Sequence, residues 1–429
     1  MVKKRKQSRS LIVILVLFVC VLVLYTLLFV NLGFIGKRSI HDDAGTYMTR
    51  HCLAFYPDSK EGLRKAKELC KGVKDDSVHD YTLIPYGDYY LINYGGDYRY
   101  FTDDRFNPIK VEGISENGQS IILDYLRYTI KKEQPDKYYN AEYIRSVNID
   151  SIDFESIEYD IDGENLACYL KDYDLTLRIP LKYVQKEIGM NFGFPYEIYS
   201  KPVYLSDADE HPIICLTFDD GPKLWTDEDY TSTERIIDTL YEYDAAGTFY
   251  VIGDALENRE IWADYQVYTM LKRSINHGNE YGSHSQSHLN SLSDLSSEES
   301  IRKEITGPIE YLKEFMNYEV KTYRPVEGEF NELVLKAQPV GAILWDVDSQ
   351  DWDSENAQQI IDQVMKYDYV SGDIILFHDI YNITAEALEK IVPALIDKGC
   401  QLVNVSTMLS YYGIDPGTLS YFYGPEYYK

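Results

Sequence analysis

The sequence has little positive charge for its length of 429 residues. It contains 42 Lys and Arg against 70 Asp and Glu, which gives a formal net charge of -28. Binding to nucleic-acid phosphates needs the opposite charge, so the composition excludes a nucleic-acid binder of the basic-groove kind. Gly and Pro are also scarce, at 26 and 15, whereas 45% of the residues are hydrophobic. We therefore expect a folded chain with room for two domains of ordinary size.

Acidic residues are absent from residues 1–38, which hold seven basic residues. Within this segment, residues 11–35 form an apolar run interrupted only by Thr26, Asn31 and Gly33. A helix rises about 1.5 Å per residue, so the run would span about 37 Å, more than the roughly 30 Å hydrocarbon layer. A signal peptide is the alternative, but its apolar region is shorter, about 7 to 15 residues, and a small-residue cleavage site follows it. Because no such site follows here, we predict a transmembrane anchor at 11–35.

The basic residues predict the orientation of this anchor. Five precede the apolar run and two follow it, and basic flanks stay in the cytoplasm. We therefore expect a cytoplasmic basic segment at 1–10 and a single-pass protein of the cell membrane. Everything from about residue 39 onward would be extracellular.

Cysteines are few and lack the spacing of a metal site. One of the six, Cys20, lies in the apolar run, and the others are Cys52, Cys70, Cys168, Cys215 and Cys400. No pair of them has CxxC spacing. Cys52 and Cys70 could close a short loop in an oxidising compartment, and free buried cysteines are the alternative.

No internal repeat or Pro/Ser-rich linker marks a domain boundary, so the boundary follows from the hydrophobic pattern. Residues 40–205 mix helical spacing, as at 121–129, with strand-like alternation, as at 157–161 and 175–179. This pattern indicates a small α+β domain, for which the sequence suggests no definite role. After residue 210, apolar runs at 213–218, 248–252, 342–345, 374–377 and 402–405 alternate with segments long enough for helices. Such alternation predicts a parallel sheet or barrel with catalytic residues at the carboxyl ends of its strands.

Functional groups follow several of these expected strands. Asp219 and Asp220 end the first run and precede a Gly-Pro turn, and two adjacent carboxylates need a cation nearby unless they only form an Asx turn. His284 and His288 are four residues apart, a spacing that suits one metal ion if the segment turns and a carboxylate joins them. His378 ends another apolar run. Taken alone, each histidine would be read as a surface or buried structural residue.

Together and in this order, five segments resemble the motifs of the polysaccharide deacetylase family, also called carbohydrate esterase family 4 or the NodB homology domain. They are TFDDGP at 217–222, HSxxH at 284–288, Arg324 to Gly328, DxxDW at 348–352 and LxH at 376–378. The resemblance covers about residues 211–413 and leaves an aromatic-rich tail at 414–429. It implies a distorted parallel (β/α) barrel of about seven repeats, preceded here by the transmembrane helix and the smaller α+β domain.

The resemblance also implies roles for the residues that would surround a metal ion. Asp220, His284 and His288 would hold a divalent metal, usually Zn²⁺, with Co²⁺ or another divalent ion as the alternative. Asp219 would be the general base for the attacking water, and Arg324 would hold Asp219 through a charge-assisted hydrogen bond.

The remaining roles concern the departing amine and the acetyl group. His378 would protonate the amine, and Asp348 would orient His378. The backbone N–H of Glu327 would stabilise the oxyanion, although the family usually reads Arg-x-Pro-Tyr-Gly where this chain has Arg324-Pro325-Val326-Glu327-Gly328. The changed motif bears on oxyanion geometry and specificity. Trp352 and Leu376 would line the acetyl pocket.

These observations predict an enzyme that removes N-acetyl groups from N-acetylglucosamine residues of a cell-envelope polysaccharide. Peptidoglycan is the leading substrate, because the anchor would confine the active site to the outer face of the membrane. Another extracellular polysaccharide is one alternative. An inactive relative that binds glycan without cleaving it is the other, but the intact acidic and histidine motifs favour catalysis.

Overall fold

The structure is a computed structural model. It describes residues 34–37, 44–48, 52–57, 60–72, 79–94, 98–103, 105–106, 109–194, 199–223, 230–257, 261–288 and 291–425. Two compact units are present, one formed by residues 1–119 and 154–198 and the other by 120–153 and 199–429. Each unit is described by itself below.

The first unit contains two sheets whose strands are mostly antiparallel. Its larger sheet has the strand order β1-β2-β3-β4-β5-β6, with strands β1 (Phe34–Lys37), β2 (Ala44–Met48), β3 (Cys52–Pro57), β4 (His79–Tyr86), β5 (Tyr89–Tyr94) and β6 (Tyr98–Thr102). Helix α2 (Lys60–Gly72) connects β3 to its parallel neighbour β4. The smaller sheet consists of β7 (Glu158–Asp162), β8 (Asn165–Leu170) and β9 (Leu175–Pro180), followed by α6 (Leu181–Val184). In β9, buried and exposed residues alternate, as expected for a half-buried strand.

The structure describes only some of the residues on which the predicted anchor and the predicted disulfide depend. Among the described residues, no helix is long and apolar enough to cross a membrane. The predicted anchor at 11–35 lies outside the described residues except for Phe34 and Ile35, which begin β1. Cys70 is disulfide-bonded, whereas Cys168, Cys215 and Cys400 are free and buried; a Cys52–Cys70 bridge stays a prediction.

The second unit is built around a parallel sheet of the order β15-β16-β10-β11-β12-β13-β14-β18, with β17 paired to β10. The strands are β10 (Ile213–Asp219), β11 (Gly247–Val251), β12 (Glu280–Ser283), β13 (Thr322–Tyr323), β14 (Gly341–Ile343), β15 (Val347–Asp348), β16 (Ile374–His378), β17 (Gln401–Leu402) and β18 (Tyr421–Phe422). All residues of β10 and β11 are buried, as in parallel strands covered on both faces. This sheet fits the predicted (β/α) barrel.

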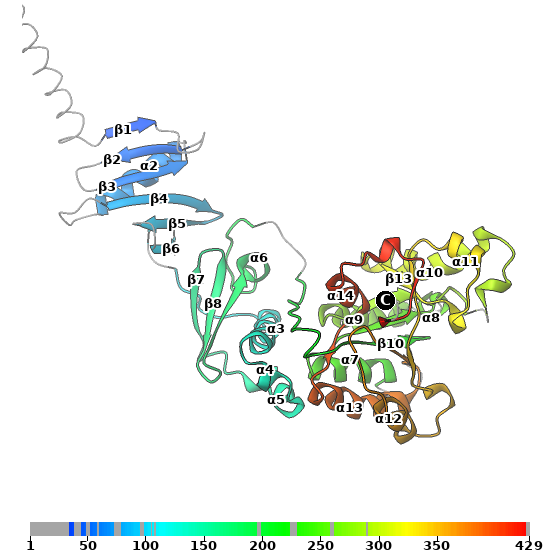
Figure 1. The fold of residues 1–429 in the computed structure, drawn as a ribbon. Coiled ribbons are helices and arrows are strands. Elements are labelled where there is room, and N and C mark those ends of the chain that lie inside the picture. The colour runs from blue at the N-terminus through cyan, green and yellow to red at the C-terminus, as the bar shows by residue number, and fades with distance from the viewer. Residues whose placement is uncertain are drawn as a thin grey trace, which may run out of the picture. The chain divides into compact units, whose positions relative to one another are not determined.

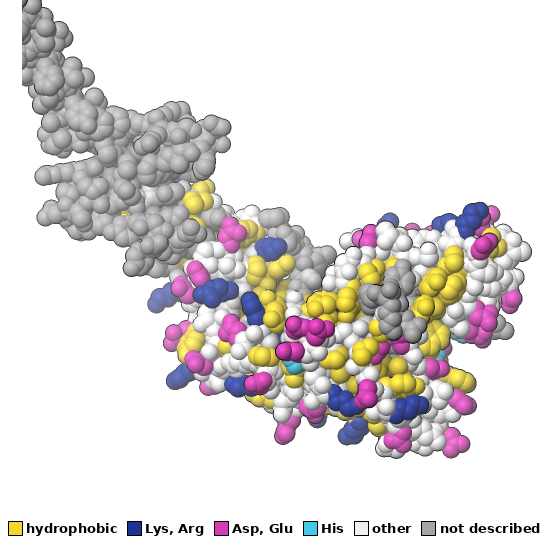
Figure 2. Space-filling model, viewed as in Figure 1, with side chains coloured by type: hydrophobic (Ala, Val, Ile, Leu, Met, Phe, Trp, Pro, Cys, Tyr) yellow, Lys and Arg dark blue, Asp and Glu magenta, His cyan; other side chains and the backbone are white. Residues whose placement is uncertain are grey.

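Helices surround the barrel sheet (Figure 1). They are α7 (Ser232–Glu242), α8 (Gly253–Glu257), α9 (Ile261–Asn276), α10 (Glu298–Met316), α11 (Glu332–Ala337), α12 (Ala357–Met365), α13 (Asn382–Asp397) and α14 (Val405–Tyr411). Capping residues fix the starts of several of them. For example, α7 begins with a capping box of Thr231 and Glu234, and the Ser297 hydroxyl accepts a hydrogen bond at the start of α10. Acidic side chains are scattered over the drawn face of the described surface (Figure 2), in keeping with the net charge of -28.

The residues predicted as one domain at 40–205 are divided between the two units. Helices α4 (Pro135–Tyr138) and α5 (Ala141–Ser146) and most of α3 (Glu116–Glu133) belong with the barrel. One buried polar contact between α3 and the barrel is made by Arg127, which is 1% exposed and whose Nη1 donates to the carbonyl of Tyr241 at 2.7 Å. Part of the predicted C-terminal tail also joins the barrel, since β18 pairs with β14.

Candidate active site

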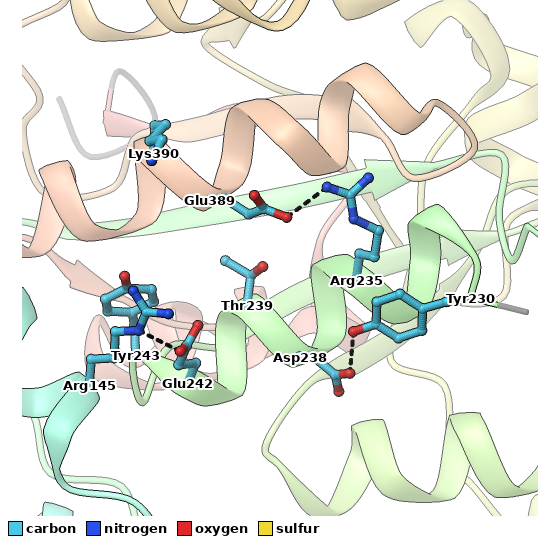
Figure 3. A pocket seen from close by; sticks show the side chains of 9 residues that line it. All are labelled: Arg145, Tyr230, Arg235, Asp238, Thr239, Glu242, Tyr243, Glu389 and Lys390. Carbon is cyan, nitrogen blue, oxygen red and sulfur yellow. Dashed lines mark hydrogen bonds and ion pairs between the residues drawn. The ribbon is translucent and has the colours of Figure 1, made fainter.

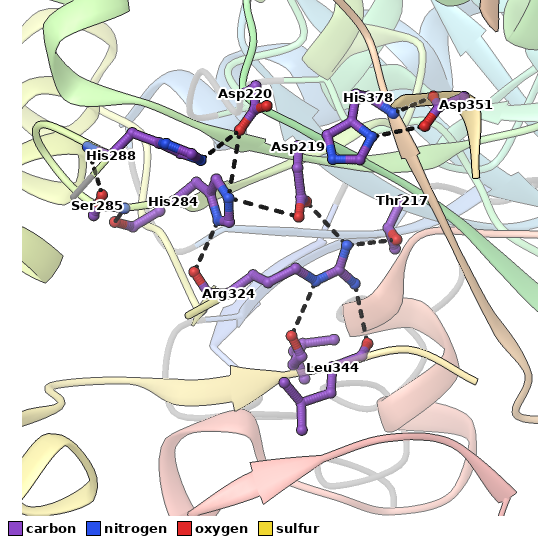
Figure 4. A network of polar contacts seen from close by, with 12 residues as sticks. Thr217, Asp219, Asp220, His284, Ser285, His288, Arg324, Leu344, Asp351 and His378 are labelled. Atoms are coloured by element: carbon purple, nitrogen blue, oxygen red, sulfur yellow. Dashed lines mark hydrogen bonds and ion pairs between the residues drawn. The ribbon is translucent and has the colours of Figure 1, made fainter. Parts of the chain in front are cut away.

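Strand register brings the predicted site residues together at the carboxyl ends of the parallel strands (Figure 4). Asp219, the last residue of β10, pairs with His378 at the end of β16 and with Tyr250 in β11. Ser283, the residue before His284, pairs with Tyr323, the residue before Arg324. Four motifs that lie far apart in the sequence therefore meet at one edge of the sheet.

Asp220, His284 and His288 form a group that can hold a metal ion. One ligand atom from each of the three lies within 4.8 Å of the others. Nε2 of His288 is 3.1 Å from Oδ1 of Asp220, and Nε2 of His284 is 3.5 Å from the same oxygen. Two imidazole nitrogens and one carboxylate oxygen are the ligand set of a catalytic zinc site.

The hydrogen bond of His284 shows that a cation fits this group. Its Nδ1 lies 2.9 Å from the carbonyl oxygen of Arg324; a carbonyl only accepts, so Nδ1 carries the proton. His284 is 3% exposed. Burial lowers its pKa below the usual value, although the negative charges of Asp219 and Asp220 act to raise it. The neutral ring therefore directs the lone pair of Nε2 toward the Asp220 carboxylate, and a metal ion between them would satisfy both.

The backbone around this group is unusual. Asp220, Ser285 and His288 are not glycines, yet they have φ angles of 73°, 72° and 49°. Such left-handed conformations cost of order 1–3 kcal/mol each and persist only where neighbouring contacts enforce them. Their concentration in TFDDGP and HSxxH makes this edge of the barrel a candidate functional site.

Asp219 lies beside the metal group and is held by a buried arginine. Arg324 is fully buried, and its Nη1 donates to Oδ1 of Asp219 at 2.9 Å and to Oγ1 of Thr217 at 2.8 Å. Its Nε and Nη2 donate to the carbonyls of Ile343 and Leu344, each at 3.0 Å. The guanidinium is thus fixed from three sides, and it leaves the second oxygen of Asp219 directed toward His284, 3.7 Å away. The predicted contact between Arg324 and Asp219 is confirmed.

The carboxylate that orients His378 is Asp351, and the prediction of Asp348 in this position is wrong. Oδ1 of Asp351 lies 2.7 Å from Nδ1 of His378, and Oδ2 accepts the backbone N–H of His378 at 2.7 Å. Asp348 pairs with Leu376, two residues before His378 in β16, and it accepts hydrogen bonds from Gln350 and Trp352 instead. Asp351 lies beyond the end of β15, level with His378.

The Asp351 contact changes the acidity of His378. Burial by itself lowers the pKa of this imidazole, but the hydrogen bond and charge of Asp351, with the charges of Asp219 and Asp220, raise it to about 9. This raised pKa favours the protonated ring at neutral pH, which suits His378 to donate a proton from Nε2. DxxDW contains both aspartates, and its spacing alone did not distinguish them.

The other predicted site residues lie on nearby loops. Glu327 is exposed and has a φ angle of 57°, in a turn that follows Arg324. Leu376 is buried in β16, whereas Trp352 is 56% exposed. That these two residues line an acetyl pocket stays a prediction.

The structure also has a groove that none of the predicted site residues lines. This groove of about 620 Å³ is lined by residues of α5, α7 and α13 and by Tyr230 (Figure 3). Its charges are largely paired, for example Arg235 with Glu389 at 2.7 Å. None of the residues that line it belongs to the five motifs, and it has no arrangement of groups suited to hydrolysis.

Comparison with known proteins points to one family. The sequence model of the polysaccharide deacetylase family matches residues 206–339. The peptidoglycan-N-acetylmuramic acid deacetylase PdaC of Bacillus subtilis is 34% identical over 50% of this chain, which spans 42% of that protein's length. A peptidoglycan-N-acetylglucosamine deacetylase of Bacillus cereus is 33% identical over 46% of this chain and 89% of its own length. The solved structure of PdaC is 34% identical and covers 48% of this chain and 94% of its own, with a TM-score of 0.42.

Proposed function

Because the chain belongs to the polysaccharide deacetylase family, we propose that it is a metal-dependent enzyme that removes the N-acetyl groups of N-acetylglucosamine residues in peptidoglycan. One observation carries the proposal: Asp220, His284 and His288 form a group that could hold a metal ion, beside an arginine-held carboxylate, Asp219, and the imidazole of His378, which pairs with Asp219 across the sheet. Hydrolysis of an amide needs these three components, namely an electrophile, a base and an acid.

The metal group would bind and orient the acetyl oxygen and a water molecule. A divalent ion held by Asp220, His284 and His288, most simply Zn²⁺, supplies positive charge that polarises a carbonyl and acidifies water. The tautomer of His284, fixed by the carbonyl of Arg324, keeps Nε2 available for this purpose.

Asp219 and His378 would move the protons of the reaction. The Asp219 oxygen that Arg324 does not bind takes a proton from the water that attacks the acetyl carbon. His378 then donates its Nε2 proton to the nitrogen of the departing sugar amine, and Asp351 stabilises the imidazolium that donates it. A cationic acid is needed because an amine is a poor leaving group until it is protonated.

The backbone N–H of Glu327 would stabilise the oxyanion. Its left-handed backbone, in the exposed turn that follows Arg324, is suited to this role. The donor belongs to the main chain, so the replacement of the family's tyrosine by Glu327 leaves it in place.

The relatives support peptidoglycan as the substrate. Two Bacillus cereus proteins named peptidoglycan-N-acetylglucosamine deacetylase are 33% and 32% identical, and the matches span 89% and 86% of their lengths. The sequence further supports attachment to the cell membrane through residues 11–35 with the barrel outside, because the run is apolar and its basic flank is N-terminal.

Digestion of purified peptidoglycan tests the choice of sugar. The treated polymer would be cut into muropeptides, and mass spectrometry would locate each loss of an acetyl group. We expect losses on glucosamine residues. Losses confined to muramic acid, the sugar named for PdaC, would contradict the proposed substrate, although not the deacetylase activity.

A further inference from the structure

Gln286 lies between the two histidine ligands, at a position that the motif HSxxH leaves open. Its amide fills a narrow space in front of two glycines that belong to different helices. A Cβ atom would lie 2.1 Å from Oε1 of Gln286 at Gly253 in α8, and 1.9 Å from it at Gly307 in α10. Neither position can carry a side chain while Gln286 keeps its place.

Hydrogen bonds fasten Gln286 to α8. Its Nε2 donates to Oδ1 of Asp254 at 2.9 Å and to Oε2 of Glu257 at 3.4 Å. The backbone on either side makes two further bonds, because the N–H groups of Gly253 and Asp254 donate to the carbonyls of Ser285 and Gln286 at 3.0 and 2.7 Å. The loop between His284 and His288 is thus attached to α8 by both its main chain and its amide side chain.

The other side of the loop is attached to α10. The backbone N–H and the hydroxyl of Ser287 both donate to Oε2 of Glu304 at 3.0 Å. Within the loop, the N–H of His288 donates to Oγ of Ser285 at 3.0 Å. These contacts hold Ser285 and His288 at φ angles of 72° and 49°, conformations that a free loop would leave.

We propose that Gln286 is a positioning residue for the metal site. By filling the space between Gly253 and Gly307 and donating to Asp254, it would hold the loop in the strained conformation that brings Nε2 of His288 to within 3.1 Å of the Asp220 carboxylate. Without the amide, the loop could relax, and His288 would have to be reordered each time a metal binds. The inference rests on the proposed function only in that the site binds a divalent metal.

Metal binding to the apoprotein tests this role without any deacetylation assay. Isothermal titration with Zn²⁺ and Co²⁺ would compare the wild type with Gln286→Ala and with Gln286→Glu, which keeps the shape but cannot donate to Asp254. Residues that support metal ligands typically contribute 10- to 100-fold to metal affinity. We therefore expect the metal affinity of both variants to be lower than that of the wild type by a factor of about 10 or more. Gln358→Ala is the matched control, because Gln358 makes a similar exposed bond to Asp362 at 2.8 Å on α12, and it should leave the affinity unchanged.

Two further measurements separate positioning from general stability. Thermal unfolding of the metal-free proteins should show similar midpoints for the wild type and the variants. The double variant Gln286→Ala/Asp254→Ala should bind metal no more weakly than Gln286→Ala alone, since the Asp254 carboxylate acts on the loop through its hydrogen bond to Gln286.

The possible outcomes bear differently on the two proposals. Wild-type affinity in folded Gln286→Ala would overturn the positioning role and leave the proposed function intact. A wild-type protein that binds no divalent metal would overturn both. Weakened binding in the variants together with a wild type that releases no acetate would support the role of Gln286 and contradict the proposed function.

Discussion

Replacing Asp351 with Asn should remove most of the activity by making His378 unable to donate a proton. In the wild type, Asp351 accepts three hydrogen bonds of 2.7 Å, from the ring and the backbone of His378 and from the Thr384 hydroxyl. The single side-chain oxygen of Asn can still accept the bonds from the His378 backbone and the Thr384 hydroxyl. Its NH₂ group then faces Nδ1 of His378 and favours the neutral ring with its proton on Nε2. Such a ring cannot act as a cationic acid.

The size of the effect follows from the acidity of His378. Its pKa of about 9 against the ordinary 6.5 corresponds to roughly 3 kcal/mol in favour of the protonated ring, to which Asp351 is the largest favourable contributor. Loss of a general acid typically costs about 10²- to 10⁴-fold. We therefore expect kcat/KM to fall by about 10²-fold or more.

The assay is the pH dependence of kcat/KM on an N-acetylglucosamine oligomer. In the wild type the rate should decline as the pH rises through about 9, because His378 then loses its proton. In Asp351→Asn, any remaining activity should decline at a lower pH, since removing the negative charge lowers the pKa of His378. Asp348→Asn is the control and should cause a much smaller loss. The reasoning would be refuted if Asp348→Asn lost activity and Asp351→Asn kept it.

Three further substitutions test the other parts of the site. Asp219→Asn should keep the fold, because its amide oxygen can still accept from Arg324, but turnover should fall by about 10²- to 10⁴-fold; near wild-type turnover would exclude Asp219 as the base. His284→Ala should remove one metal ligand, so elemental analysis should find far less than one zinc per chain, and full occupancy would contradict the ligand set. Glu327→Tyr restores the family's residue and keeps the backbone N–H, so turnover should stay within a few-fold. A large loss there would show that the Glu327 side chain takes part.

The apolar pattern of the chain predicted a parallel sheet or barrel, and the family resemblance implied the barrel. Parallel strands such as Ile213–Asp219 and Ile374–His378 are buried along almost their whole length, so they appear in the sequence as short continuous apolar runs. The run at 402–405 predicted a longer strand than exists, because the side chain of Asn404 caps helix α14 at Val405 and ends the strand. Local capping decided this boundary, and hydrophobicity could not show it.

The metal group could be predicted because its three residues lie in two short sequence motifs. The carboxylate that binds His378 could not, because its identity depends on how the strands are paired. Asp348 and Asp351 are chemically identical in the sequence. Strand β15 ends at Asp348, which pairs with Leu376, and the turn that follows brings Asp351 next to His378. The role of Gln286 could not be predicted, because it depends on two glycines that are 54 residues apart and meet only in the fold.

Acetate release from an N-acetylglucosamine oligomer, measured before and after removal of divalent metal, tests the central claim most directly. The account predicts that the purified protein releases acetate, that a chelator stops the release and that added Zn²⁺ restores it. His284→Ala should release none under any of these conditions. No acetate from the zinc-loaded wild type would contradict the account and favour a glycan-binding relative without catalysis, and release that continues in the chelated protein would show that the metal group has no part in the reaction.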